Sequence, residues 1–202
     1  MLAKFEACPP ITDEMWPAVA HHEAGHVVAY ILGSRAIHGN DGCFKVCIRP
    51  GATAPYVHEN GKKSDCVAIV DSLSFYNDNS SKSYGDCDLF DSSVAIQEVI
   101  VSLAGPFAEA AFHGVSDPRH MEECAIFDAQ NSGDIESAIE AFEDLRHISQ
   151  RPPRWGTLVR RAARLVLDNR SAIEALAERL LVKHELDFDE AMAIVAPHLT
   201  AQ

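Results

Sequence analysis

The chain has 202 residues, of which 47% are hydrophobic, and a formal net charge of -13. This length and composition are typical of one globular domain with its own core, so we expect a single domain over residues 1–202. The negative charge repels phosphate backbones and anionic lipid, which argues against nucleic acid and membrane as partners. No signal peptide is visible, and VAIQEVIVSLAG (94–105) is shorter than the about 20 residues that span a bilayer, so a cytoplasmic location is expected.

Six cysteines are present, and none of them forms a C-x-x-C pair. In a chain with no export signal they are predicted to be free thiols. The alternative is a structural zinc site, but the spacings fit no common zinc template. That alternative would use Cys43, Cys47, Cys66 and Cys87.

The first half of the chain predicts a helix, a strand and a long insertion. A helix is expected from Glu14 to a C-cap at Gly33. Apolar side chains alternate through Phe44–Arg49, which predicts a strand. Residues 51–91 read as an insertion that contains a second strand in VAIVDSLSF and a long mobile surface loop over 76–91.

The second half of the chain is predicted to be helical. A second helix is expected from Ser92 or Ser93 to about Gly114, with a kink or a break at Pro106. A third covers about Asp134–Ile148, and three amphipathic helical stretches follow over about 154–198. The predicted fold class is therefore mostly α with a small β-sheet (α+β).

The most informative motif is HEAGH, residues 22–26, which lies within the first predicted helix. Residues four apart stand on the same helix face, so His22 and His26 are able to hold one metal ion together. Glu23 lies beside that ion as a base, in the H-E-x-x-H pattern of zinc hydrolases. His21 is rotated by about 100° on the helix and is not expected to join the site.

A catalytic zinc requires a third protein ligand and one open position. One known zinc-peptidase pattern places a glycine and a third histidine shortly after the second histidine, but Ala29 and Leu32 occupy those positions here. The third ligand must therefore come from a distant part of the chain. The candidates are Glu98, Glu109, His113, Asp128 and Asp134.

Five segments in chain order resemble the peptidase domain of the FtsH-type ATP-dependent zinc metalloproteases. They are HEAGH, FKVCIRPG, SLAGPFAEAAFHG, NSGDIESAIEAF and NRSAIEALAERLLVKHELDFDEAMAIV, and together they extend over about residues 15–196. The resemblance implies an H-E-x-x-H zinc-peptidase helical domain with one Zn²⁺ per chain. It implies His22, His26 and Asp134 as zinc ligands, Glu23 as the catalytic base, and Glu109 as a support for a ligand histidine.

The sequence also departs from that family. It contains no nucleotide-binding G-x-x-x-x-G-K-[ST] motif, Pro106 replaces the arginine usual after the helix glycine, and the 51–91 segment is longer than the corresponding connection. We expect a metalloendopeptidase that cuts unfolded or flexible proteins with a zinc-activated water, either alone, as a homo-oligomer or with a separately encoded ATPase. The alternative is a zinc-binding regulatory protein that keeps the fold with little turnover.

The strand Phe44, Lys45, Val46, Cys47, Ile48 and Arg49 has two interpretations. In the first, it pairs with an extended polypeptide substrate through main-chain hydrogen bonds, which implies loose sequence selectivity. The alternative is an ordinary structural strand, either at the edge of the sheet or inside it.

Overall fold

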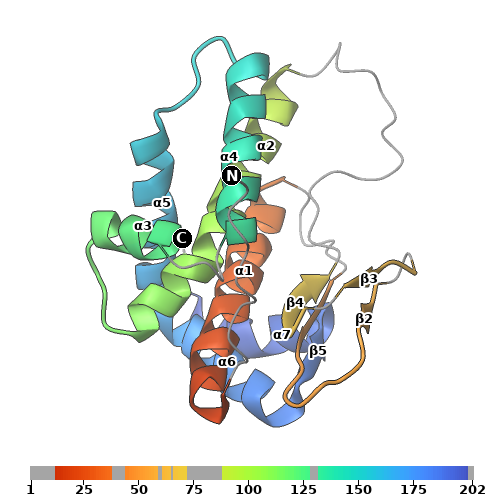
Figure 1. The fold of residues 1–202 in the computed structure, drawn as a ribbon. Coiled ribbons are helices and arrows are strands. Elements are labelled where there is room, and N and C mark those ends of the chain that lie inside the picture. The colour runs from red at the N-terminus through yellow and green to blue at the C-terminus, as the bar shows by residue number, and fades with distance from the viewer. Residues whose placement is uncertain are drawn as a thin grey trace, which may run out of the picture.

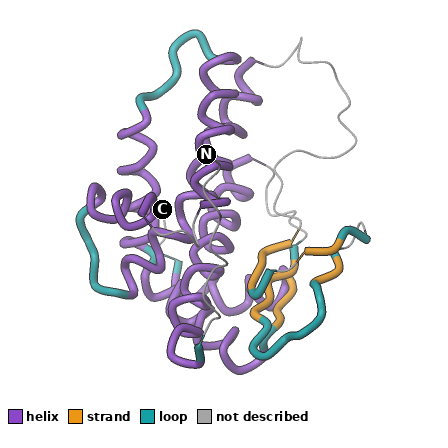
Figure 2. Tube along the Cα trace, in the orientation of Figure 1, coloured by secondary structure: helices purple, strands orange, loops and turns teal. Residues whose placement is uncertain are grey.

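The computed structural model describes residues 12–37, 44–58, 61–64, 66–71, 88–127 and 132–199. Helices form most of this part of the chain, and the short strands gather on one side of the helical body (Figures 1 and 2), as the predicted α+β class requires. The helices are α1 Trp16–Ile37, α2 Asp88–Phe112, α3 Pro118–Phe127, α4 Ser132–Ile148, α5 Trp155–Asp168, α6 Arg170–Lys183 and α7 Phe188–Val195, with 3-10 turns at Asp13–Met15 and Ala196–His198. The strands are β1 Lys45–Ile48, β2 Tyr56–Val57, β3 Lys63–Ser64, β4 Ala68–Asp71 and β5 Glu185–Asp187.

Three strands form an antiparallel sheet in the order β4-β1-β5. Strand β1 is the middle strand, with Val46 opposite Val70 on one side and Leu186 on the other. The side chains of Val46 and Leu186 are buried, so this side of the sheet closes the core. Strands β2 and β3 form a separate hairpin on the outer side of the sheet (Figure 1).

Helices α1 and α2 cross at very short distance, and small residues make this possible. A Cβ atom added to Gly25 of α1 would lie 2.6 Å from Cβ of Ala108 in α2 and would overlap the carbonyl oxygen of Ala104. Only glycine allows the two backbones to approach this closely. The crossing brings the HEAGH segment against the C-terminal half of α2.

Helix α2 is one helix from Asp88 to Phe112, with Pro106 inside it, so the predicted break at this proline is wrong. It also starts before the predicted Ser92, and residues 88–91 are helical rather than part of a loop; residues 76–87 lie outside the described part of the chain. Within α2, Ser92–Phe112 is long and apolar enough to span a membrane, but 72% of its apolar window is buried inside the protein. Burial of this kind is typical of a core helix.

Other predicted elements are confirmed with changed ends. Helix α1 continues through Gly33 to Ile37, so the predicted C-cap is wrong. The third predicted helix corresponds to α4, and the three C-terminal helices to α5, α6 and α7. Helix α7 starts with a capping box in which Asp187 accepts from the backbone N–H of Glu190.

The thiols in the described residues are free, as predicted. These are Cys47, Cys66 and Cys124. Two of the four ligands of the alternative cysteine zinc site, Cys43 and Cys87, lie outside the described residues.

Candidate metal centre

Helices α1 and α4 bring three potential ligands to one point. His22 and His26 stand one turn apart on α1, and Asp134 lies in the first turn of α4. One donor atom from each residue lies within 4.8 Å of the other two. Asp134 places one carboxylate oxygen 3.0 Å from Nε2 of His22 and the other 3.4 Å from Nε2 of His26. Among the described residues, this is the one group of three whose donor atoms converge in this way.

The second nitrogen of each imidazole is held by a hydrogen bond. Nδ1 of His26 donates to the carbonyl oxygen of Val101 at 2.8 Å, and Nδ1 of His22 donates to the carboxylate of Glu109 at 3.0 Å. Because Nδ1 carries the hydrogen in both rings, each neutral ring presents a lone pair at Nε2. The two Nε2 atoms are 3.1 Å apart. Hydrogen-bonded Nδ1 atoms with converging Nε2 atoms are typical of histidines that bind metal.

Two lone pairs and a carboxylate at this distance repel one another unless a cation lies between them. The pKa values show how strongly the cluster attracts positive charge. Burial lowers the pKa of His22, but hydrogen bonds to Asp134 and Glu109 outweigh burial and raise it to about 10. Burial also lowers the pKa of His26, but the charge of Asp134 and its hydrogen bond outweigh burial, so this pKa is raised as well. Protons and a metal cation compete for the same lone pairs.

Asp134 is the anionic partner in this cluster. Burial by itself raises the pKa of its carboxyl group, but the charge of His26 and the hydrogen bonds from both imidazoles outweigh it. The pKa of Asp134 is therefore held well below its ordinary value. Its carboxylate remains charged over the whole physiological range, as a metal ligand must.

Glu23 follows His22 on α1 and is buried, with 7% of its surface exposed. Burial raises the pKa of its carboxyl group, and the nearby charges of His22 and His26 partly oppose the rise. A raised pKa makes a carboxylate a stronger base than an exposed glutamate. Glu23 thus places a buried carboxyl group beside the three converging residues.

The sheet supplies one neighbour of this site whose proximity to Glu23 the sequence did not predict. Cys47 of β1 is buried, and burial raises the pKa of its thiol to about 12, with smaller contributions from Cys66, Glu185 and Glu23. The side chain of Cys47 is therefore a neutral thiol within electrostatic range of Glu23. In the sequence Cys47 falls between the alternating apolar side chains of Phe44–Arg49, but in the structure Val46, Cys47 and Ile48 are all buried.

Strand β1 corresponds to the segment Phe44–Arg49, for which pairing with a substrate strand was one prediction. Both of its edges already pair, with β4 on one side and β5 on the other. No main-chain donors or acceptors of Lys45–Ile48 are left to receive a third strand. The prediction of a substrate-pairing strand is wrong here, and the alternative of an inner strand is the one observed.

The remaining candidates lie apart from the metal centre or outside the described residues. Nδ1 of His21 donates to the carbonyl oxygen of Pro17 at 2.7 Å, so this histidine stays out of the site as predicted. Glu98 and His113 do not belong to the converging group, and Asp128 lies outside the described residues. Glu109 holds His22 instead of completing the ligand set.

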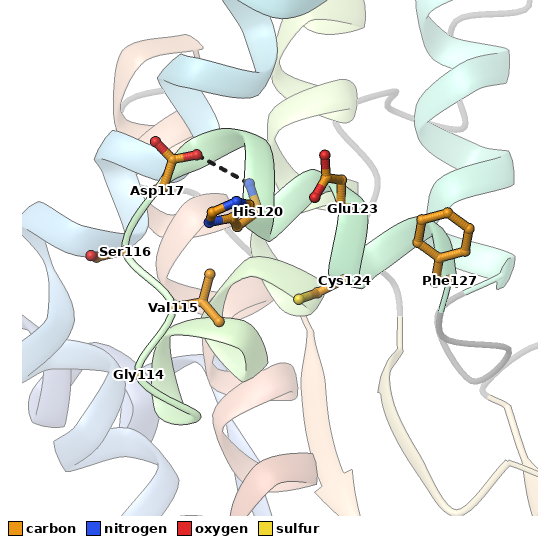
Figure 3. Close-up of a pocket in the computed structure, with 8 residues that line it drawn as sticks. All are labelled: Gly114, Val115, Ser116, Asp117, His120, Glu123, Cys124 and Phe127. Carbon is orange, nitrogen blue, oxygen red and sulfur yellow. Dashed lines mark hydrogen bonds between the residues drawn. The ribbon is translucent and has the colours of Figure 1, made fainter.

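A hollow of about 650 Å³ lies elsewhere, at the turn from α2 into α3 (Figure 3). Its lining includes residue types that bind metals, but their donor atoms do not lie as close together as those of His22, His26 and Asp134. The lining residues are Gly114, Val115, Ser116, Asp117, His120, Glu123, Cys124 and Phe127.

Comparison of the sequence with protein-family models and with curated proteins gives no match.

Proposed function

We propose that the protein is a zinc-dependent metalloendopeptidase that hydrolyses peptide bonds in unfolded or flexible polypeptides. The observation that carries this proposal is the convergence of His22, His26 and Asp134 beside a buried Glu23. Two imidazoles and one carboxylate form a ligand set that suits zinc and leaves a coordination position open for chemistry.

The residues present fit a resident zinc ion. Both Nε2 lone pairs and the Asp134 carboxylate point to one place, and the Nδ1 atoms are fixed by Glu109 and by the Val101 carbonyl. A zinc ion held there acts as a Lewis acid toward water and toward the carbonyl group of the substrate. The site is built from two long helices, so its ligands are rigidly placed.

Glu23 is the proton carrier of the proposed reaction. It accepts a proton from the attacking water and returns it to the amine that leaves when the peptide bond breaks. The raised pKa of its carboxyl group supports both steps. A site with a purely structural metal requires no base at this position and is usually closed by a fourth ligand.

The choice of peptide as substrate rests on the resemblance to the FtsH-type peptidase domain. The sequence contains no G-x-x-x-x-G-K-[ST] motif. We therefore propose that this chain cuts segments that are already flexible, because a folded substrate offers an extended segment only in its rare open population. A separately encoded ATPase or self-association would extend this range.

Cleavage of unfolded casein by the purified chain tests the proposal. We expect fragments with zinc present, none with an excess of chelator, and recovery when zinc is restored. The rate should not change when ATP is added to the pure chain. Zinc binding without any cleavage of casein or of a peptide library would instead support the regulatory zinc protein.

The variant Glu23→Gln separates metal binding from chemistry. Glutamine keeps the shape of the side chain but removes the base, so we expect normal zinc content and a cleavage rate lower by roughly 10²- to 10⁴-fold. Glu14→Gln, an exposed change in the turn before α1, is the matched control and should cleave at the normal rate. Normal cleavage by Glu23→Gln would contradict the assigned base.

A further inference from the structure

A separate row of hydrogen-bonded polar side chains lies on the hairpin β2–β3 and at the end of β4. Oδ1 of Asp71 is 3.0 Å from Nδ1 of His58, and Nε2 of His58 is 2.9 Å from Oγ of Ser64. A carboxylate, an imidazole bridging through both nitrogens, and a serine hydroxyl thus lie in line. This is the order of contacts in an Asp-His-Ser nucleophilic triad, which is recognised by geometry and not by chain order.

The directions of these hydrogen bonds follow from what each group is able to donate. The carboxylate of Asp71 accepts only, so Nδ1 of His58 carries the hydrogen and Nε2 presents its lone pair. The hydroxyl of Ser64 must then donate to Nε2. Its oxygen remains free to accept from the thiol of Cys66, whose sulfur lies 3.1 Å away. Nε2 of His58 is therefore placed to take the proton of the serine hydroxyl.

The carboxylate of Asp71, at the end of this row of side chains, is fixed in position. Asp71 is buried, with 9% of its surface exposed, although it ends an edge strand of the sheet. The hydroxyl of Tyr56 donates to its second oxygen at 3.2 Å. Burial of a carboxylate is costly unless partners hold it, and here Tyr56 and His58 both do.

The backbone of the hairpin positions the other two residues. The N–H of His58 donates to the carbonyl oxygen of Lys62, and the N–H of Gly61 donates to that of His58, each at 2.8 Å. Gly61 has a φ angle of +79°, which other residues rarely adopt. This tight turn folds Ser64 back beside Tyr56, its register partner across the hairpin. Arg49 ties the segment to β1 by donating to the carbonyl oxygen of Cys66.

The site is accessible and separate from the metal centre. Ser64 and His58 are partly exposed, and Lys62 and Lys63 beside them are exposed. Figure 1 shows the hairpin on the outer side of the small sheet, away from the crossing of α1 and α2 that carries HEAGH. None of its three residues belongs to the converging metal ligands.

We propose that Asp71, His58 and Ser64 form a second, metal-independent nucleophilic site, with Ser64 as the nucleophile and small activated esters as the class of substrate. The hydroxyl oxygen of Ser64 attacks the carbonyl carbon while its proton passes to Nε2 of His58. The bond to the alcohol then breaks, and the departing oxygen takes the proton from His58. The acyl group is left on Ser64, and water removes it by the same sequence with Nε2 again as base.

A fluorophosphonate probe tests this site directly, because it forms a stable phosphonyl ester with an activated serine and releases fluoride. The protein is first stripped of metal with chelator, so the result does not depend on the proposed peptidase activity. We expect one probe per chain by intact mass, located on Ser64 by peptide mapping. No adduct on the folded wild-type chain, or an adduct on Cys66 or elsewhere instead of Ser64, would overturn the proposal.

Matched variants distinguish an activated serine from a hairpin that is merely hydrogen-bonded. His58→Gln keeps a hydrogen-bonding side chain but removes the base, so the labelling rate should fall at least about 100-fold. Asp71→Asn should also slow labelling, because the imidazole loses the partner that fixes its tautomer. Ser64→Ala should abolish labelling, and Ser171→Ala, an exposed serine on α6, should leave it unchanged. Labelling at the wild-type rate in folded His58→Gln would show that the contact is structural only.

Discussion

The imidazole of His26 occupies the space that a side chain at Gly105 would need. A Cβ atom added to Gly105 would overlap Nε2, Cε1 and Cδ2 of this ring. The ring lies flat against α2 in this way, with Nδ1 donating to the carbonyl oxygen of Val101 one turn earlier. The absence of a side chain at position 105 therefore makes room for His26 in the candidate metal centre.

Gly105→Ala should weaken zinc binding without removing any ligand. The added methyl group forces the His26 ring away from α2, and loss of a supporting contact of this kind typically costs about 10- to 100-fold in metal affinity. Competition with a chromophoric chelator measures the change. Gly133→Ala is the control, because its Cβ meets nothing within 4 Å although it stands next to Asp134. Equal zinc affinity in the two variants would show that the position of His26 does not depend on Gly105.

Glu109 should support zinc binding through His22. Glu109→Ala removes the acceptor for Nδ1 of His22, which lies 3.0 Å from the carboxylate, and we expect an affinity loss of about 10- to 100-fold. Glu109→Gln keeps an acceptor oxygen and should lose less. Isothermal titration with zinc distinguishes the two, and an unchanged affinity in Glu109→Ala would contradict the role.

The sequence predicted the part of the site that lies within one helix. His22 and His26 are four residues apart, so their shared face and the adjacent Glu23 followed from helix geometry alone. Asp134 is 112 positions from His22, and no local pattern connects them. Only the family resemblance selected it from five candidates, because the packing of α4 against α2 that brings it to α1 is a tertiary contact.

Local sequence patterns did not predict the shortest strands or the exact ends of the helices. Strand β5 has three residues, and it exists because β1 pairs with it, not because its own sequence favours a strand. Helix α1 runs past Gly33 to Ile37, because a glycine inside a helix costs only about 1 kcal/mol and does not by itself end the helix. The contacts among Asp71, His58 and Ser64 arise from the pairing of β2 with β3 and from the position of the end of β4. No spacing in the sequence indicated them.

The metal-free protein should lose stability as the pH rises from 6.5 to 10. The folded state holds the pKa of His22 at about 10, above its ordinary value of 6.5, so folding binds a proton that the unfolded chain releases. This contribution is complete below pH 6.5 and is lost as the pH approaches 10. Asp134, whose pKa is lowered, acts in the opposite sense, and its contribution is lost in acid.

Urea denaturation in the presence of chelator at pH 6, 8 and 10 measures this dependence. His22→Gln is the reference, because it removes this titrating imidazole, so its stability should fall less over the same range. Saturating zinc should reverse the trend, since the imidazoles bind metal in the neutral form. A wild-type slope equal to that of His22→Gln would refute this account of the cluster.

The zinc content of the purified chain tests the central claim most directly. Elemental mass spectrometry gives the zinc concentration, which is divided by the protein concentration of the same sample. The wild-type protein should hold one zinc ion per chain, and Asp134→Asn should lose most of it because the third ligand loses its charge. Asp144→Asn, an exposed change on the same helix, should retain one zinc ion. A wild-type chain that binds no zinc, or an Asp134→Asn chain that keeps it all, would contradict the metal centre proposed for His22, His26 and Asp134.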